Sequence, residues 1–406
     1  MQPLNIFVVH PSDTLTDHLP NGAGWIDYNY LRGLAERGHT LHVATPRIEL
    51  RDPVPRNLNL HLIEGTGSKR PGFRERLAYL GGVRRLLRKL ERETRFDIAQ
   101  QFTPVETGLS LAIAGSGIPL VLGPYSGHWA SEAFGPVKPR SVATRLKHAV
   151  RDALAWLQQQ QADALVITCP AAMERVRSRG LQKRVHVIPH GIHARDYPAR
   201  EFVPGRSSIL FLAVLEYWKG IFTLLEAFDR VAAELPHAEL ELWGDGKERQ
   251  AVEEWVARSP HRDRIHLRGR APRERVSEIM RSHSLYCMPS YGEPFGMTLL
   301  EAMASGVPVV TTDAGGPPSI VQSAGGRVVP MRDVPKLAEA LVEILSKPEL
   351  QVSMGEYNRR RIEQEYDWSR QLDRMEAVYE SVLGEVPHSK ENRQVPASAA
   401  SPFSRK

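Results

Sequence analysis

Short apolar runs alternate with amphipathic stretches along almost the whole chain, and this alternation limits the fold more than any other feature of the sequence. The apolar runs, of which NIFVVH at residues 5–10 is the first, have the length of buried strands, and the stretches between them have helical spacing. Strands that alternate with helices form parallel sheets with helices on both faces. The predicted fold class is therefore α/β, with Rossmann-like, doubly wound sheets.

Two series of these runs, separated by a polar segment that contains two prolines, predict two domains of the same class. The expected strands lie at residues 5–10, 39–45, 96–100, 118–123, 162–168 and 184–189, then at 209–215, 239–244, 264–269, 284–289, 307–313 and 325–330. The predicted organisation is an N-terminal domain at 1–190, a linker at 191–207, a C-terminal domain at 208–356, helices at 357–385 that return toward the N-terminal domain, and a disordered tail at 386–406.

No apolar run approaches the length needed to cross a bilayer, and the N-terminus has no signal-peptide layout, so we expect a cytoplasmic protein. Cys169 and Cys287 stand far apart in apolar contexts, which predicts buried thiols rather than a metal or redox pair. The chain has no Asp-x-Asp pair, so we expect neither a metal held by such carboxylates nor any other cofactor.

Basic residues are unevenly spread in this chain, whose formal net charge is +6. Residues 69–95 hold ten Lys or Arg against three Glu, a balance that suits nucleic acid, an anionic membrane or phosphorylated substrates. The absence of an accompanying aromatic or groove-reading module disfavours nucleic acid. The apolar residues of this stretch fall at helical spacing, and they are Leu77, Leu80, Val83, Leu87 and Leu90.

This stretch has two interpretations. In the first it is a domain helix with a buried apolar stripe and solvated arginines. In the second it also rests reversibly on the inner, anionic face of a membrane, as a peripheral contact. The basic residues that would extend such a face are Lys138, Arg140, Arg145 and Lys147.

The stretch PSYGEPFGMTLLEAMASGVPVV, at 289–310, places polar groups where a predicted strand ends and a helix begins, which is where parallel sheets bind ligands. Gly296 allows close approach, and the free N–H groups of residues 295–297 favour phosphate. Further into the helix, Glu301 can accept hydrogen bonds from a ribose diol, and Glu293 can accept them from hydroxyls beyond the phosphates. The arrangement suits a nucleotide diphosphate sugar, although glutamates near a helix start are also common without any ligand.

The same stretch resembles the EPFG-x4-EAM-x2-G-x-PVV signature of retaining glycosyltransferases of the GT-B fold, family 4, also called glycosyl transferases group 1. Other segments resemble the family in the same order, namely NGAGWIDYNYLRGLAERGH, VIPHGI, LWGDGKER and TTDAGGPPSIV. The resemblance implies two Rossmann-like domains that face each other across a cleft.

The resemblance also implies roles for individual residues. Glu301 would bind the ribose, Glu293 would contact the donor sugar, and Lys219 would neutralise the diphosphate leaving group, where a fixed cation lowers the barrier. Lys219 and Glu293 are thus the predicted catalytic residues. The predicted donor-binding residues are Gly22, Gly24, Lys219, Gly269, Arg270, Glu293, Phe295, Gly296, Met297, Thr298 and Glu301.

The chain departs from the family pattern in three places, the first being Asn21 and Ala23, which dilute the usual double glycine around Gly22 and Gly24. Family members usually carry an arginine five residues before the lysine, where LAVLEYWKG has Val214. Arg268 or Arg270 could replace it; otherwise turnover would be low, or the chain would bind a donor without transferring it. Many members also have a histidine where this chain has Tyr125, and the nearby His128 is either a substitute or incidental.

The sequence thus predicts a retaining, metal-independent hexosyltransferase (EC 2.4) that moves a sugar from a nucleotide diphosphate sugar to a hydroxyl of a sugar or lipid-linked acceptor, in surface polysaccharide or glycolipid biosynthesis. The alternatives are a non-catalytic or weakly active nucleotide-sugar-binding protein and a GT-B nucleotide-sugar epimerase. The donor base, the sugar, the acceptor, the pathway and the oligomeric state stay open, because loops make those contacts.

Overall fold

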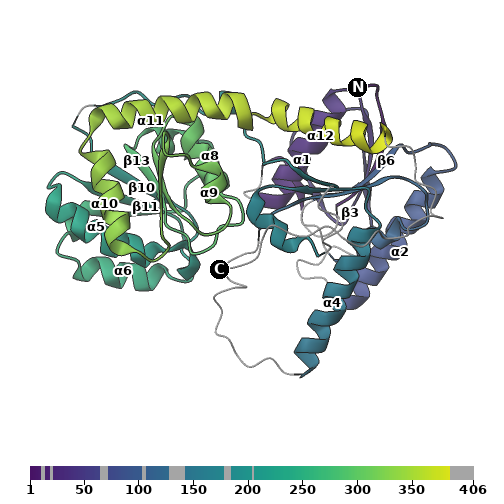
Figure 1. The fold of residues 1–406 in the computed structure, drawn as a ribbon, viewed down its shortest axis with the longest axis horizontal. Coiled ribbons are helices and arrows are strands. Elements are labelled where there is room, and N and C mark those ends of the chain that lie inside the picture. Colours follow the sequence, from purple (N-terminus) through teal and green to yellow (C-terminus); the bar gives the residue numbers. More distant parts are fainter. Residues whose placement is uncertain are drawn as a thin grey trace, which may run out of the picture.

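The computed structural model describes residues 1–10, 14–18, 22–64, 72–102, 107–127, 142–177, 184–203 and 205–384. It consists of two α/β domains, each built on one parallel sheet that is covered by helices (Figure 1). The predicted fold class, with two parallel-sheet domains, is therefore confirmed. His128 and the predicted tail at 386–406 lie outside the described residues.

The N-terminal sheet has seven parallel strands in the order β5-β3-β1-β6-β7-β8-β9. Their bounds are Asn5–Val9 (β1), Thr40–Thr45 (β3), Leu58–Leu62 (β5), Ile98–Gln101 (β6), Leu120–Tyr125 (β7), Ala164–Ile167 (β8) and Val185–Val187 (β9). A separate two-stranded sheet pairs β2 (Leu15–Thr16) with β4 (Ile48–Glu49). The edge strand β5 is absent from the predicted strands because Asn59 and His61 interrupt its apolar run, as half-exposed strands allow.

Both faces of the N-terminal sheet are buried. Ile6 and Val8 of β1 belong to a core cluster that includes residues of α1 (Gly22–Glu36). Phe7 and Val9, which point to the opposite face, belong to a second cluster with residues of α2 (Phe73–Leu90). This two-sided burial explains why most of these strands appear in the sequence as continuous apolar runs.

The C-terminal sheet has six parallel strands in the order β12-β11-β10-β13-β14-β15, and each overlaps a predicted run. The strands are Ser208–Leu212 (β10), Glu239–Trp243 (β11), Ile265–Gly269 (β12), Leu285–Met288 (β13), Val309–Thr312 (β14) and Gly326–Val329 (β15). The helices of this domain are Ile221–Glu234 (α5), Arg249–Arg258 (α6), Val276–Arg281 (α7), Met297–Ala304 (α8), Pro317–Ile320 (α9) and Val334–Leu345 (α10).

The chain crosses between the domains a second time near its C-terminal end (Figure 1). The elements there are α11 (Pro348–Arg361), a π-helical turn (Ile362–Tyr366) and α12 (Trp368–Gly384). In α12, Trp368 packs against Tyr30 of the N-terminal domain, with ring centres 4.9 Å apart. The two crossings are hydrogen-bonded to each other, since the Ile192 N–H donates to Tyr366 O at 2.9 Å and the Trp368 N–H donates to Ile192 O at 3.3 Å.

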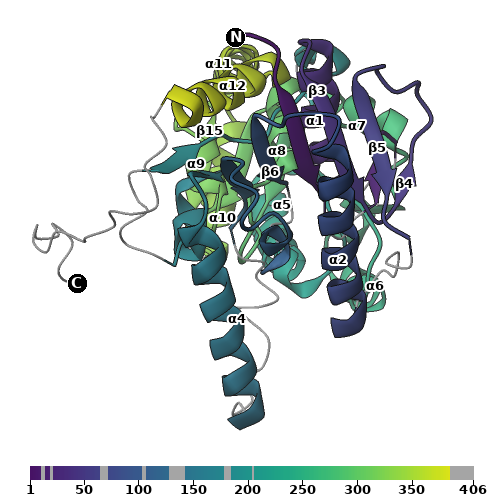
Figure 2. The same ribbon diagram turned by 90° about the vertical axis from the view of Figure 1, so that its right-hand side faces the viewer.

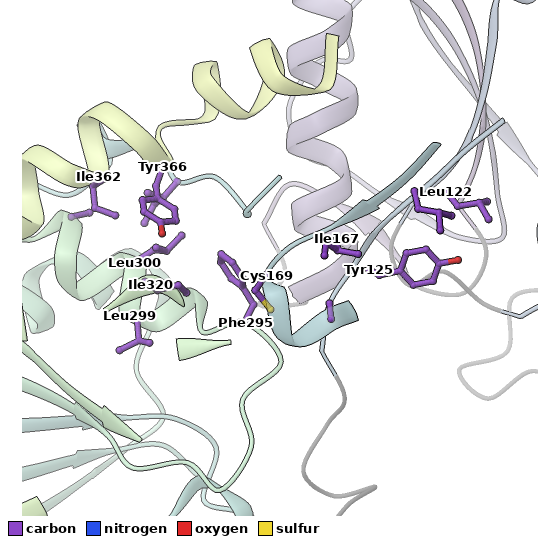
Figure 3. Close-up of a cluster of buried hydrophobic side chains, with 14 of the residues drawn as sticks. Leu122, Tyr125, Ile167, Cys169, Phe295, Leu299, Leu300, Ile320, Ile362 and Tyr366 are labelled. Carbon is purple, nitrogen blue, oxygen red and sulfur yellow. The ribbon is translucent and has the colours of Figure 1, made fainter. Parts of the chain in front are cut away.

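One buried apolar cluster continues from the N-terminal domain into the C-terminal domain (Figure 3). Ile167 and Cys169 extend it from the end of β8, and Phe295 and Leu299 extend it from the region of α8. The Cys169 thiol also donates a hydrogen bond to the carbonyl oxygen of Pro294 at 3.5 Å. The two domains therefore meet where β8 and β13 end.

The helix α2 differs from the prediction in its first turns. Val83, Leu87 and Leu90 are buried as expected, but Leu77 is 51% exposed. The reason is that, among the α2 side chains that the structure describes, Tyr79 is the first one buried in the core, and Leu77 precedes it.

Both cysteines are buried free thiols, as predicted. Burial raises the pKa of the Cys287 thiol, because the thiolate would lose its hydration there. In the described part of the chain, no helix is long and apolar enough to span a membrane.

Candidate functional site

The turn after β13 brings the amino terminus of α8 to the edge of the C-terminal sheet. Gly296 precedes this helix with φ of 108°, a left-handed conformation that glycine adopts readily. A Cβ atom at this position would lie 3.0 Å from the Leu299 side chain. The first N–H groups of a helix have no acceptor within it, so they are available to a group beyond its end. This is where the sequence places the donor phosphates.

Glu293 and Lys219 form an ion pair beside this terminus, although they are 74 positions apart in the chain. Lys219 Nζ lies 2.5 Å from Glu293 Oε2 and 4.2 Å from the ring centre of Trp218. The lysine side chain is 12% exposed and that of the glutamate 8%. The backbone of Glu293 is fixed too, because the Gly316 N–H donates to its carbonyl oxygen at 2.8 Å, and a Cβ at Gly315 would come within 2.2 Å of that oxygen. The two predicted catalytic residues therefore lie together.

Glu301 lies on α8 with a buried carboxylate. The Tyr197 hydroxyl donates to its Oε1 at 3.0 Å, and Arg273 Nη1 lies 3.4 Å from the same oxygen. Arg273 in turn stacks on Trp25 of α1, with its Cζ 4.8 Å from the ring centre. Burial raises the pKa of Glu301, while the charge of Arg273 and the hydrogen bond from Tyr197 oppose that rise. Sequence reasoning missed Tyr197, Arg273 and Trp25, because no local motif marks them.

Three other predicted donor-binding residues turn their side chains into the protein. Thr298 Oγ1 accepts a hydrogen bond from the Tyr286 hydroxyl at 2.8 Å. Met297 packs against the core clusters, and Phe295 is 3% exposed. The side chain of Phe295 is therefore closed to a donor, whereas those of Met297 and Thr298 remain partly exposed.

The two arginines considered as replacements for the missing family arginine are already engaged elsewhere. Arg268 Nη2 donates to Glu241 Oε1 at 3.1 Å. Arg270 follows Gly269, which ends β12 with φ of 75°, and its 83% exposed side chain lies 3.5 Å from Asp245. Within the described residues, neither guanidinium contacts a carboxylate of the signature.

Val214, at the position of the family arginine, is 52% exposed. It follows β10, while the next residue, Leu215, is buried in the core of the C-terminal domain. An exposed valine offers a phosphate neither charge nor a side-chain hydrogen bond.

The N-terminal domain holds the remaining predicted residues. Gly22 begins α1, and Gly24 is buried in the first turn. Tyr125 ends β7 with its hydroxyl directed away from Phe295 (Figure 3), and burial raises its pKa to about 12. The hydroxyl of Tyr125, which the sequence offered as a donor contact, is therefore not directed toward the turn that precedes α8. The structure does not describe His128.

Other groups of the N-terminal domain do contact this turn. The Gly127 N–H donates to Pro294 O at 3.2 Å. The His190 ring packs edge-on against Phe295, with centres 4.8 Å apart, and its Nε2 lies 3.3 Å from Ser126 Oγ. Burial lowers the pKa of His190 to about 3, so the ring is neutral at physiological pH. The N-terminal domain therefore packs on the backbone that leads into α8.

Two family models match consecutive parts of the chain, namely Glycosyltransferase Family 4 at residues 20–196 and Glycosyl transferases group 1 at residues 196–361. The glycogen synthase of Mycobacterium tuberculosis is 30% identical over 237 residues, which cover 55% of this chain and 55% of that protein, so the chain spans about half the length of this relative. The MMP alpha-(1->4)-mannosyltransferase of Mycolicibacterium hassiacum is 26% identical over 391 residues, 87% of this chain and 93% of that protein.

Among solved structures, the sucrose-phosphate synthase of Thermosynechococcus elongatus is similar, with a TM-score of 0.71 at 19% identity, over 94% of this chain and 100% of that chain. A likeness at this identity shows the fold, and it confirms the GT-B arrangement of the two domains. Together the two family models cover residues 20–361. The chain belongs to the group 1 glycosyltransferases of the GT-B fold.

Proposed function

We propose that the protein transfers a hexose from a nucleotide diphosphate sugar to a hydroxyl acceptor, with retention of configuration and without a metal ion. The observation that carries this proposal is the region of the α8 terminus, where Glu293, paired with Lys219, precedes the helix and the buried carboxylate of Glu301 lies within it. The names of the relatives, a glycogen synthase and a mannosyltransferase, support hexosyl transfer during polysaccharide or glycolipid synthesis.

In this proposal the α8 terminus holds the distal phosphate, Glu301 accepts hydrogen bonds from the ribose, and Glu293 contacts the sugar. The acceptor oxygen bonds to the anomeric carbon as the bond from that carbon to the phosphate oxygen breaks, and the acceptor proton passes to the leaving phosphate. The charge that develops on the diphosphate is offset by Lys219, whose ammonium group is held in a largely buried site.

Thermal-shift measurements with UDP-, GDP-, ADP- and dTDP-sugars test the donor site. We expect at least one of these donors to raise the melting temperature, and Glu301→Ala to abolish that rise. Glu278→Ala, which removes an exposed carboxylate on α7, is the matched control and should keep it. A full shift in Glu301→Ala would mean that the ribose binds elsewhere.

The stereochemistry and the metal requirement need a turnover assay. NMR of the first-formed product should show the anomeric configuration of the donor, whereas the opposite configuration would refute retention. Activity should survive treatment with EDTA. A loss that Mg²⁺ restores would refute metal independence.

A non-catalytic nucleotide-sugar-binding protein is the second candidate, and the exposed Val214 favours it. Donor consumption separates the two functions. Release of nucleoside diphosphate that depends on an added sugar or lipid-linked acceptor supports the transferase. A saturable donor-induced thermal shift without consumption, across the acceptors tried, supports the binding protein.

We also propose peripheral contact of the N-terminal domain with anionic lipid. The helix α4 (Val142–Gln160) extends beyond the rest of this domain (Figure 2) and exposes large apolar side chains, which are Val150, Leu154, Trp156 and Leu157. The exposed cations of α2 include Arg84, Arg85, Arg88 and Lys89. Apolar and basic groups on neighbouring helices of one domain suit the interface of an anionic membrane. Lys138 and Arg140 lie outside the described residues, as do the side chains of Arg145 and Lys147.

Co-sedimentation with vesicles tests this contact. Binding to phosphatidylglycerol vesicles should weaken at high salt and on replacement by phosphatidylcholine. Leu154→Glu should weaken it further, whereas Leu383→Glu, at an equally exposed leucine on α12, should not. Binding that does not change with the charge of the vesicles would contradict the proposed membrane contact.

A further inference from the structure

Within the described residues, Lys219 is the predicted donor-binding cation that pairs with a signature glutamate, whereas a donor brings two phosphate groups. Lys219 stands beside the α8 terminus, but Val214 occupies the place of the family arginine. A diphosphate leaving group gains charge as the glycosidic bond breaks, so a second cation would stabilise both the bound donor and the transition state.

Arg273 is a cation that is already part of this site. Its Nη1 lies 3.4 Å from Glu301 Oε1, and its Cζ lies 4.8 Å from the ring centre of Trp25. The Arg273 side chain is 38% exposed, whereas that of Glu301 is 10% exposed. The guanidinium is therefore the part of this pair that can move.

The two ends of the donor site share one pattern. Each signature glutamate is paired with a cation of the same domain, Glu293 with Lys219 and Glu301 with Arg273. A donor whose hydroxyls hydrogen-bond to these carboxylates competes with the two cations for them. The same donor brings phosphates, which are the preferred partners of a guanidinium.

The distance that Arg273 must cover is short. Glu301 is four residues after Met297, which begins α8, and a helix rises about 1.5 Å per residue, so the terminus is about 6 Å away along the axis. A guanidinium at the end of an arginine side chain can cover such a distance by changing rotamers. The Trp25 ring provides an aromatic face against which the guanidinium can remain packed as it moves.

We propose that Arg273 is the second cation of the donor site: it leaves Glu301 when the ribose hydroxyls bind this carboxylate, and it then contacts the diphosphate. The inference rests on the proposed donor site. It gives Arg273 the phosphate-binding role that the family resemblance would assign to an arginine at position 214, where this chain has Val214. Arg268 does not fit this role because its partner is Glu241, which lies outside the signature, so a donor that binds the signature glutamates does not release it. Arg270 remains the rival, since its side chain is 83% exposed and its ion pair with Asp245 is 3.5 Å long.

The test separates contact with phosphate from contact with the nucleoside. The wild-type protein is first titrated calorimetrically with UDP, GDP and ADP, and the nucleoside diphosphate that binds most tightly is used in the later measurements. The affinity for its nucleoside is then measured by competition. Arg273→Ala should weaken the diphosphate about tenfold to hundredfold more than the nucleoside, and Arg273→Lys should recover part of the difference. The nucleoside corrects for any effect of the mutation on Glu301 itself.

Arg275→Ala is the matched control, because Arg275 lies on the same short 3-10 helix as Arg273 and is paired with Glu278. It should leave both affinities unchanged. Equal losses for diphosphate and nucleoside in Arg273→Ala, or no loss, overturn the inference. A selective loss of diphosphate in Arg270→Ala, with none in Arg273→Ala, gives the role to Arg270. If wild type binds none of the three diphosphates, the proposed donor site fails, and the inference fails with it.

Discussion

The two signature glutamates are held in different ways. Glu293 has its partner Lys219 in the same domain, at 2.5 Å, and its backbone is fixed against Gly315 and Gly316. Glu301 depends on groups from three parts of the chain, since Tyr197 comes from the predicted linker, Arg273 from the C-terminal domain and Trp25 from the N-terminal domain.

In the proposed donor site, the described side-chain partner of Glu293, at the sugar end, comes from its own domain, whereas the partners of Glu301, at the ribose end, are a linker tyrosine and an arginine that packs on the facing domain. Changes at the sugar end should therefore affect chemistry most strongly. Changes at the ribose end should alter donor affinity and its dependence on pH. The predictions below test this contrast.

The largest effect is expected at the sugar end. Lys219→Met should lower kcat by about a hundredfold to a thousandfold, because the leaving diphosphate loses its fixed cation. The melting temperature should also fall, because Glu293 is left buried without its partner. Adding Glu293→Gln should restore the melting temperature but not kcat. Recovery of kcat in the double variant would mean that Lys219 acts only through folding.

Glu301 should give the ribose end a pH-dependent contribution to stability. Burial raises its pKa above 4.5, so the folded protein binds this proton more tightly than the unfolded chain does. Stability from this group is present below pH 4.5 and is lost as pH rises through the raised pKa; each tenfold difference in proton affinity is worth about 1.4 kcal/mol. Urea denaturation should show the stability of Glu301→Gln, relative to wild type, increasing with pH and then levelling off. A difference that stays constant with pH would contradict this.

A smaller effect is expected for the linker tyrosine. Tyr197→Phe removes one hydrogen bond to Glu301, so the carboxylate is less firmly oriented and its pKa rises further. Donor affinity should fall about fivefold at neutral pH with kcat almost unchanged. Tyr357→Phe, which removes a hydroxyl that bonds Gln322 on another surface, is the control. A fall in kcat with unchanged affinity would remove the contrast between the two ends.

The smallest effect should come from the facing domain. Trp25→Leu removes the aromatic face beneath Arg273 and should weaken nucleoside diphosphate binding about twofold to threefold, the range of an exposed cation–π contact. Trp25→Phe should keep most of the affinity. Equal losses in both variants would assign the effect to packing against Trp368 instead.

The sequence predicts the fold well because its strands are buried on both faces, as the two core clusters around β1 show. It also predicts Glu293, Lys219 and Glu301 as site residues, because each belongs to a segment with a recognisable order of residues, and the structure brings Lys219 and Glu293 together. The side-chain contacts within the site are harder to predict from the sequence. Arg268 has the right charge, but its contact with Glu241 depends on strands β11 and β12 being neighbours.

The missed residues share a physical cause. Tyr197 and Arg273 reach Glu301, and Trp25 reaches Arg273, only after the linker has turned and the domains have met. Leu77 was predicted to be buried because helical spacing does not show where the core ends. In each case the deciding contact is between distant parts of the chain.

The bridge between Ile192 and Asp367 has a mechanical consequence. The same two segments are joined further along the chain as well, since Arg359 Nη1 donates to Ala194 O at 3.1 Å and Arg200 Nη2 donates to Gln351 Oε1 at 3.3 Å. Segments joined in this way resist being drawn apart or slid past one another. Tyr197 is five positions from Ile192 and is itself bonded to the returning segment through Arg359. In the proposed donor site, any change in the angle between the domains would therefore act on the Tyr197 contact with Glu301, whereas Lys219 and Glu293 would move together with the C-terminal domain.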